Sequence, residues 1–170
     1  TTTLWTNDAP GDRGAFAASQ AAGAGAEYYA LDRGERARAA APFVDETVLA
    51  DWNALGVDAL LSVAAVTDDE TAEAFARRAL RTITEALIED GETVHYRADE
   101  RDVPDGERGL LLDTARTIRA LVTARAVLGP DAGETADDGP AASGVVAIAR
   151  DLADVAIEER RPGSTFVDGP

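Results

Sequence analysis

Two acidic residues at predicted helix starts, Asp45 and Asp113, are the first candidates for chemistry in this sequence. A glycoside hydrolase of the usual kind places two carboxylates about 5 Å or about 6.5–9.5 Å apart across a pocket. Carboxylates at helix beginnings also act as N-caps, which accept hydrogen bonds from unpaired backbone N–H groups. Because the chain contains 32 acidic residues, the pair alone does not decide between these two roles.

Three further side chains lie where they could contact a ligand. Trp52 stands on the apolar stripe of the first long predicted helix, where it either fills the core or stacks on a sugar ring. Asn53 is a poor helix former beside that stripe, so it either caps a neighbouring loop or faces a pocket. His95, the only histidine, is either a solvated loop residue or a ligand contact. The candidate ligand-binding residues are therefore Asp45, Trp52, Asn53, His95 and Asp113, with no catalytic set and no metal site identified.

Four long helices are predicted from apolar residues that recur at steps of three and four. They cover residues 46–66, 69–89, 109–128 and 140–159. Asp45 is expected to cap the first of them, and a short β element is expected near 93–97. Residues 1–45 are expected to form an irregular segment that packs on the helices. The sequence thus predicts an all-α fold, with residues 46–170 forming a domain of helical hairpins.

Consecutive hairpins with alanine-rich packed faces stack into solenoids or close into α/α toroids. A toroid of six hairpins needs about twice this length, so the chain is expected to be a partial toroid. The chain begins Thr1-Thr2-Thr3 and contains no Met, which also indicates a processed product or a fragment of a longer protein.

Composition excludes several classes of function. The net charge of −16 and a pI near 4.3 argue against nucleic-acid binding. The absence of cysteine excludes disulfides, thiol catalysis and cysteine-based zinc sites within this chain. No apolar run is long enough to span a bilayer, and no signal peptide opens the chain, so we expect a cytoplasmic protein that does not bind membranes.

The charge pattern also indicates a habitat. All sixteen basic residues are Arg, and the many Asp and Glu residues are spread along the whole chain. This composition predicts a halophilic protein, whose acidic surface stays soluble where concentrated salt screens charge repulsion. The alternative is an acidic cation-binding protein, which would concentrate its acids in ligand loops.

An ordered set of short motifs carries a family resemblance. The motifs are Gly14-Ala15-Phe16, Ser19-Gln20, Glu27-Tyr28-Tyr29, Pro42 with Asp45, Leu49, Trp52-Asn53 and Leu55, and finally Gly109 to Ala115. This set resembles, in the same order, the motifs of the YyaL-like, spermatogenesis-associated thioredoxin-domain protein family, here in a haloarchaeal-type sequence. In that family a thioredoxin-like domain precedes a glycosidase-like α/α toroid of six hairpins.

The chain departs from the family where chemistry would be expected. The family's Asp-Ala-Asp acids are absent, with Ala21 and Ala22 near their place. Thr47 replaces a basic residue, Thr114 replaces a Tyr, and the thioredoxin-like domain is not in this chain. The resemblance therefore implies a glycosidase-like toroid domain with a carbohydrate-type ligand pocket, no catalytic set and no cofactor. The alternative is a non-catalytic interaction module that docks a thioredoxin-like domain or another subunit.

Overall fold

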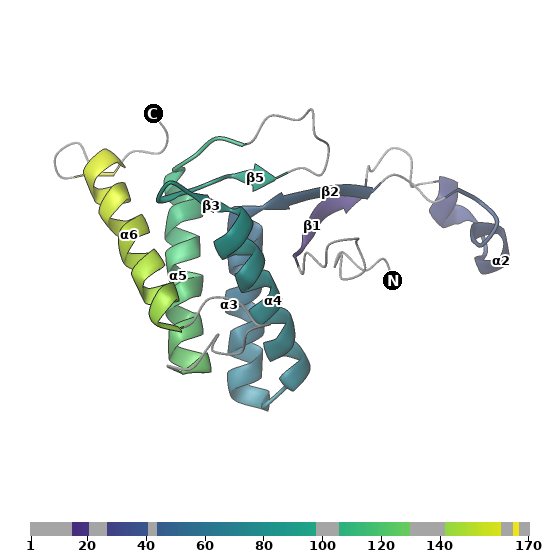
Figure 1. Cartoon of the computed structure of the whole chain (residues 1–170). Helices are drawn as coiled ribbons and strands as arrows, with labels where there is room; N and C mark the ends of the chain where they lie inside the picture. Colours follow the sequence, from purple (N-terminus) through teal and green to yellow (C-terminus); the bar gives the residue numbers. More distant parts are fainter. Residues whose placement is uncertain are drawn as a thin grey trace.

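Two helical hairpins form the body of the protein in the computed structural model (Figure 1). The structure describes residues 15–20, 27–40, 44–97, 106–129, 142–160 and 165–166. The first hairpin consists of α3 (Ala50–Thr67) and α4 (Glu70–Ala86), and the second of α5 (Leu111–Leu128) and α6 (Ala142–Arg160). The predicted all-α class is confirmed in that the described chain is mostly helical.

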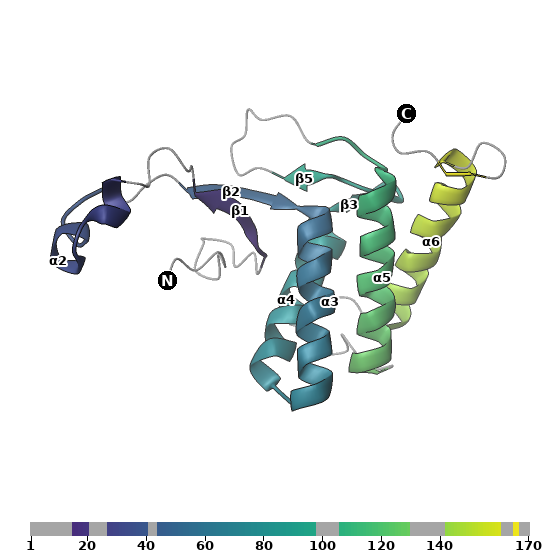
Figure 2. The same cartoon turned by 180° about the vertical axis from the view of Figure 1, so that it is seen from behind.

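The helices lie in two layers. In Figure 2, α3 and α5 run side by side in the same direction on the near side, and α4 and α6 lie behind them. Helix α3 packs against both α4 and α5, and α5 packs against α6, whereas α4 and α5 touch little. The helices therefore contact one another in the order α4–α3–α5–α6. None of them, over its described length, is both long and apolar enough to cross a membrane.

Small and branched apolar side chains fill the space between the layers. The largest fully buried ones are Leu61, Ile83, Leu87, Leu121 and Leu152. Burying each such side chain contributes about 1.5–3 kcal/mol. Buried alanines on the facing surfaces of α3, α4 and α5 let the helix backbones approach closely.

Short strands cover one end of the helices. Strands β1 (Ala17–Gln20), β2 (Val44–Leu49) and β5 (Tyr96–Arg97) form an antiparallel sheet in the order β1-β2-β5. A tight hairpin joins β3 (Ile88–Glu89) to β4 (Glu92–Thr93). Its turn residues Asp90 and Gly91 both have positive φ, 54° and 84°, as a two-residue hairpin turn requires. The short helix α2 (Arg33–Arg36) precedes β2 and is capped by Asp32.

The predicted start of the first long helix is wrong. Asp45 is not an N-cap, because it belongs to β2, where it pairs with Ser19. The helix begins at Ala50 after an extended Leu49, which makes no side-chain cap hydrogen bond. Val44, Thr47 and Val48 are β-branched and fit a strand, and the partner strands β1 and β5 favour that conformation over an extra helical turn. The predicted domain boundary at 45/46 therefore falls inside β2, whereas the β element near 93–97 is present as β4 and β5.

The predicted apolar face of α3 is also wrong. The buried face consists of Ala50, Asn53, Ala54, Val57, Leu61 and Ala64. Trp52, predicted on the packed stripe, is 53% exposed and is not part of this buried face. Because α3 is apolar around most of its circumference, its composition fits either face and periodicity alone chose the wrong one.

Candidate functional site

Two of the candidate residues meet in a direct contact. His95 lies between β4 and β5, and Asp113 lies in the first turn of α5. The His95 Nδ1 atom is 2.8 Å from Asp113 Oδ2. The Asp113 side chain is only 3% exposed, whereas the His95 side chain is 33% exposed. A buried carboxylate at a helix N-terminus, where the helix dipole favours negative charge, thus orients a partly accessible imidazole ring.

Backbone hydrogen bonds fix the position of this pair. The Ala50 N–H donates to the His95 carbonyl at 2.9 Å, which ties the segment to the start of α3. The His95 N–H donates to the Glu107 carbonyl at 2.8 Å. Beside the pair, the buried hydroxyls of Thr93 and Thr114 are 2.8 Å apart. The segment of residues 93–95 therefore links the first turns of α3 and α5.

Asn53 has a structural role. Its side chain is fully buried, and its Oδ1 accepts a hydrogen bond from the Phe16 N–H at 2.7 Å. Its Nδ2 donates to the carbonyls of Phe16 at 3.1 Å and Leu49 at 2.8 Å. Of the two predicted roles, capping a neighbouring segment is the one observed, since Asn53 clamps the beginning of β1 onto α3.

The other two candidates differ in their placement. Trp52 is exposed near the start of α3, two residues after the Ala50 N–H that binds the His95 carbonyl, so Trp52 and His95 lie at the same end of the helices. The backbone of Asp45 lies in β2, and its side chain is outside the described part of the structure. The structure thus brings His95 and Asp113 together, places Trp52 at the same helix ends, and assigns Asn53 to the β1 contact.

Sequence reasoning missed a polar seam between α3 and α5. Asp51 Oδ2 accepts a hydrogen bond from Arg116 at 2.5 Å. Two helical turns further on, Asp58 accepts a hydrogen bond from the hydroxyl of Thr123 at 2.7 Å and binds the guanidinium of Arg119 at 2.9 Å. The seven-residue spacing of the two acids puts both carboxylates on one side of α3, which was the available signal.

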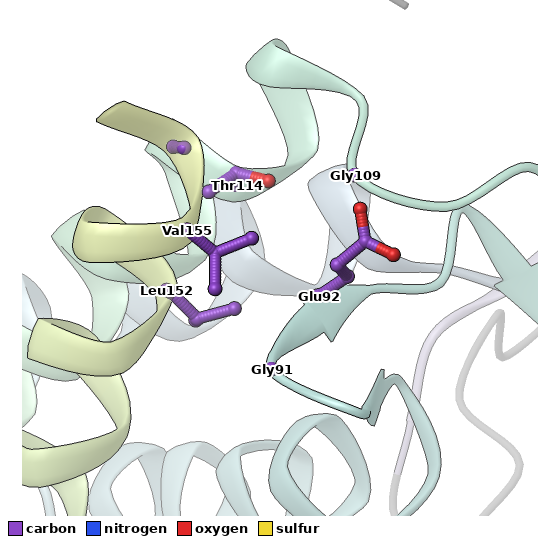
Figure 3. Close-up of a pocket in the computed structure, with 7 residues that line it drawn as sticks. Gly91, Glu92, Gly109, Thr114, Leu152 and Val155 are labelled. Carbon is purple, nitrogen blue, oxygen red and sulfur yellow. The ribbon is translucent and has the colours of Figure 1, made fainter. Parts of the chain in front are cut away.

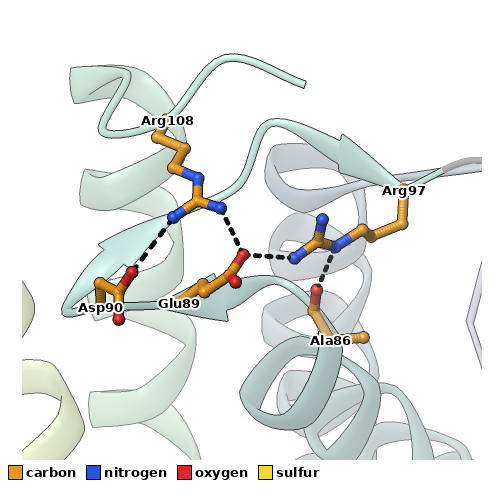
Figure 4. A network of polar contacts seen from close by, with 5 residues as sticks. All are labelled: Ala86, Glu89, Asp90, Arg97 and Arg108. Atoms are coloured by element: carbon orange, nitrogen blue, oxygen red, sulfur yellow. Dashed lines mark hydrogen bonds and ion pairs between the residues drawn. The ribbon is translucent and has the colours of Figure 1, made fainter. Parts of the chain in front are cut away.

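A network of arginines anchors the β3–β4 hairpin (Figure 4). Glu89 Oε2 accepts hydrogen bonds from Arg97 at 2.8 Å and from Arg108 at 2.6 Å. Arg97 also donates to the Ala86 carbonyl at the end of α4, and Arg108 reaches Asp90 at 3.4 Å. This network holds the hairpin against α4 and explains why arginine, with its several donors, is used here.

A small pocket lies on the other side of this hairpin (Figure 3). It opens between the hairpin, the start of α5 and α6, and is lined by Gly91, Glu92, Gly109, Thr114, Leu152, Val155 and Ala156. Its cavity volume is about 10 Å³, which is room for about one water molecule and far below the roughly 300–1,000 Å³ of typical small-molecule sites. It contains none of the five predicted ligand-binding residues. Among the described residues, no group of three or more metal-ligating side chains is placed to hold an ion.

Six large apolar side chains are exposed on α3 and α5, and we call the surface that they occupy the α3/α5 face. It consists of the exposed side chains of Trp52, Leu55, Val63, Val66, Leu112 and Val122. Their exposed fractions range from 44% for Leu55 to 84% for Val66. All three carboxylates of these two helices are withdrawn from it, since Asp51 and Asp113 are buried and the Asp58 side chain is 16% exposed. One exposed charged side chain, that of Arg119 at 73%, lies beside these residues on α5 and binds Asp58. Several exposed apolar side chains on two adjacent helices ordinarily mark an interaction site.

Comparisons with known proteins leave the site to be interpreted from its own geometry. No protein-family model matches the chain, and no curated protein matches it. The resemblance seen in the motifs from Gly14 to Ala115 therefore stays a prediction. What the structure itself offers is a His95–Asp113 pair, an exposed Trp52 and an apolar face on one helix layer.

Proposed function

We propose that this chain is a non-catalytic interaction module, built from α/α hairpins, that docks a partner on the α3/α5 face. The observation that carries this proposal is that α3 is apolar on both of its faces. A helix that is apolar all round is ordinarily buried on all sides. One face of α3 is buried against α4 and α5, and the opposite face is the one that a partner would cover.

The contrast between α3 and α4 supports this proposal. Helix α3 has only two charged residues, Asp51 and Asp58, and both bind side chains of α5. Helix α4, in the other layer, has six charged residues and exposes no large apolar side chain along its described length. In a chain with a net charge of −16, a solvent-facing surface without exposed carboxylates is the exception. Helix α4 has the composition of a solvated surface, and α3 has that of an interface.

The family resemblance implies which partners could cover the α3/α5 face. It implies a thioredoxin-like domain and further toroid hairpins in the same protein, and either would bring an apolar surface to the α3/α5 face. A separate subunit with an apolar surface would serve equally well. In each case the hairpins act as a scaffold and need no catalytic residues.

An apolar dye tests whether the face is available in the folded protein. The chain at low concentration should enhance the fluorescence of anilinonaphthalene sulfonate. The double variant Leu55→Glu/Val63→Glu should lose most of that signal and keep its melting temperature, because both side chains are exposed in the native state. Ala74→Glu, at an exposed position of α4, is the matched control and should keep the signal. Equal dye binding by all three proteins would contradict the proposal.

A carbohydrate-type ligand site in an α/α toroid is the second candidate function. It is favoured by the exposed indole of Trp52 at the same helix ends as the Asp113-bound imidazole of His95. Aromatic faces and paired polar groups are the usual means of binding sugars in open sites. The parallel α3 and α5 would then be neighbouring inner helices of the toroid.

Fluorescence distinguishes this second function. With Trp5 replaced by Phe, Trp52 is the only indole, and its emission should shift saturably when a sugar that stacks on it is added. Asp113→Asn, which weakens the orientation of His95, should reduce the affinity for that sugar. A panel of mono- and oligosaccharides that leaves the emission of the folded protein unchanged would reject this function without affecting the first.

A further inference from the structure

We propose that the partner on the α3/α5 face is a second copy of this chain, packed with its α3 antiparallel to the first around a two-fold axis at Ala59. This inference rests on the proposed docking function and names its partner. It follows from the spacing, the exposed area and the charge of the face.

The spacing of the exposed stripe on α3 is the same in both directions. Trp52, Leu55, Ala59, Val63 and Val66 are exposed and are separated by three, four, four and three residues. These steps place all five on one side of a helix. In an antiparallel pair, Trp52 faces Val66 of the second copy and Leu55 faces its Val63. A two-fold interface requires such a self-complementary pattern. If residue i of one copy contacts residue j of the other, then residue j of the first copy must contact residue i of the second.

The sizes of these side chains also suit a two-fold contact. Ala59, the smallest, lies at the centre, and the larger side chains lie towards both ends. A small residue at the crossing point allows the two helix axes to approach to about 8–10 Å. The larger residues then close the gaps that open as crossed helices diverge. A stripe with its bulk at the centre would hold the two helices apart.

The exposed area approaches that of a dimer of ordinary size. A standard interface removes about 800 Å² from each partner. The six large apolar side chains of the α3/α5 face supply roughly 100 Å² each when covered, or on the order of 600 Å² in total. Ala59, Ala115 and Ala126, which are also exposed on these helices, add to this area. The face of one copy therefore provides most of what a stable two-fold contact needs.

Charge decides how such a dimer responds to salt. Each copy has a net charge of −16, which opposes association. The carboxylates of α3 and α5 are withdrawn from the α3/α5 face, and the exposed charge on these helices is the cationic Arg119. The repulsion between the two net charges therefore acts mainly over distance, where salt screens it. The Debye length falls from about 10 Å at 0.1 M salt to about 3 Å at 1 M. Association should therefore strengthen with salt, whereas an interface made of ion pairs would weaken.

The cysteine-free chain allows the geometry to be tested by cross-linking. Ala59→Cys should form an intermolecular disulfide under mild oxidation, because the two-fold axis places the two copies of residue 59 next to each other. Trp52→Cys alone should not, since the two copies of residue 52 lie about 20 Å apart along antiparallel helices. A mixture of Trp52→Cys with Val66→Cys should cross-link as a heterodimer. Ala74→Cys on α4 is the matched control and should form no intermolecular disulfide.

Sedimentation equilibrium measures the association itself. The dissociation constant of the unmodified chain should fall at least tenfold between 0.1 M and 1 M sodium chloride. Leu55→Glu should raise it at least tenfold, with the helical circular dichroism unchanged because Leu55 is exposed in the monomer. Dimers that cross-link at residue 74, or at 52 alone, would overturn the proposed geometry.

The outcomes separate this inference from the proposed function. A chain that stays monomeric at all salt concentrations, while its α3/α5 face still binds the apolar dye, would overturn the second copy as partner and leave the docking function with another occupant. A chain that neither associates nor binds the dye would overturn both.

Discussion

Replacing Asn53 by Ala should unfasten the beginning of β1 from α3. The Asn53 side chain is fully buried and makes three hydrogen bonds, two with the backbone of Phe16 and one with the Leu49 carbonyl. Alanine keeps the helix, and has a higher helix propensity than asparagine, but it forms none of these bonds. The variant therefore isolates the polar contact between α3 and the N-terminal strand.

The size of the effect follows from the groups left unpaired. The Phe16 N–H, the Phe16 carbonyl and the Leu49 carbonyl lose a partner. Each buried polar group that is left unsatisfied costs about 1–3 kcal/mol, and partly exposed ones recover some of that by binding water. Phe16 is half-buried, so part of the loss is recovered there. We expect Asn53→Ala to lower the free energy of unfolding by about 2–4 kcal/mol.

Urea unfolding followed by far-ultraviolet circular dichroism gives this free energy directly. Hydrogen exchange of the Phe16 amide reports the local contact and should accelerate strongly in the variant. Ser62→Ala is the matched control on the same helix, since its exposed hydroxyl binds only the Asp58 carbonyl one turn earlier. That control should change stability by less than about 0.5 kcal/mol. A loss below about 1 kcal/mol in Asn53→Ala, with the Phe16 amide still protected, would refute this account of the clamp.

Three further perturbations test the core and the candidate site. Gly56→Ala should destabilise the protein by about 1–3 kcal/mol, although alanine has a better helix propensity than glycine, because a Cβ at Gly56 would lie 2.6 Å from the Phe16 ring. In a Phe16→Ala background, where that ring is absent, the same substitution should stabilise the protein by about 1 kcal/mol. Asp113→Asn should cost about 1–3 kcal/mol in urea unfolding and shift the imidazole resonance of His95, which is the only histidine. Leu61→Ala should cost about 2–5 kcal/mol, measured in the same way, because Leu61 is fully buried.

Each of these has a control and a contrary result. Val66→Ala, at a position 84% exposed on the same helix as Leu61, should be nearly neutral, and similar losses for the two would mean that the faces of α3 are misassigned. An unchanged imidazole resonance in Asp113→Asn would show that the carboxylate does not bind the ring in solution. A Gly56→Ala effect that is the same with and without the Phe16 ring would place its cause in the helix backbone.

Much of the helical framework could be predicted from the sequence. The second long helix was predicted over residues 69–89 and is observed over Glu70–Ala86, where Asp69 caps it by accepting hydrogen bonds from the Thr71 and Ala72 N–H groups. These signals are local, since a cap and a repeat of apolar residues act within one or two turns. The same locality explains the error at residues 44–49. Their strand conformation depends on pairing with β1 and β5, which lie far away in the sequence.

The candidate site was only partly predictable, for a related reason. His95 and Asp113 were both singled out, yet nothing in their eighteen-residue separation indicates a 2.8 Å contact. That contact depends on how the β4–β5 segment crosses the start of α5. For Trp52 the difficulty was the choice of helix face. Helix α3 is apolar all round, so its periodicity fits two faces, and only the packing of α4 and α5 determines which one is buried.

The helices contact one another in the series α4–α3–α5–α6, and this arrangement has a consequence for how such a protein can change in length. The first hairpin touches the second mainly through α3 and α5, and the two outermost helices of the series, α4 and α6, make at most slight contact in the described part of the chain. A duplicated hairpin could therefore be appended beyond α6, or ahead of α3, without breaking an existing helix contact. Growth by gene duplication would then extend the molecule one hairpin at a time, and each added hairpin would find an existing helix to pack against.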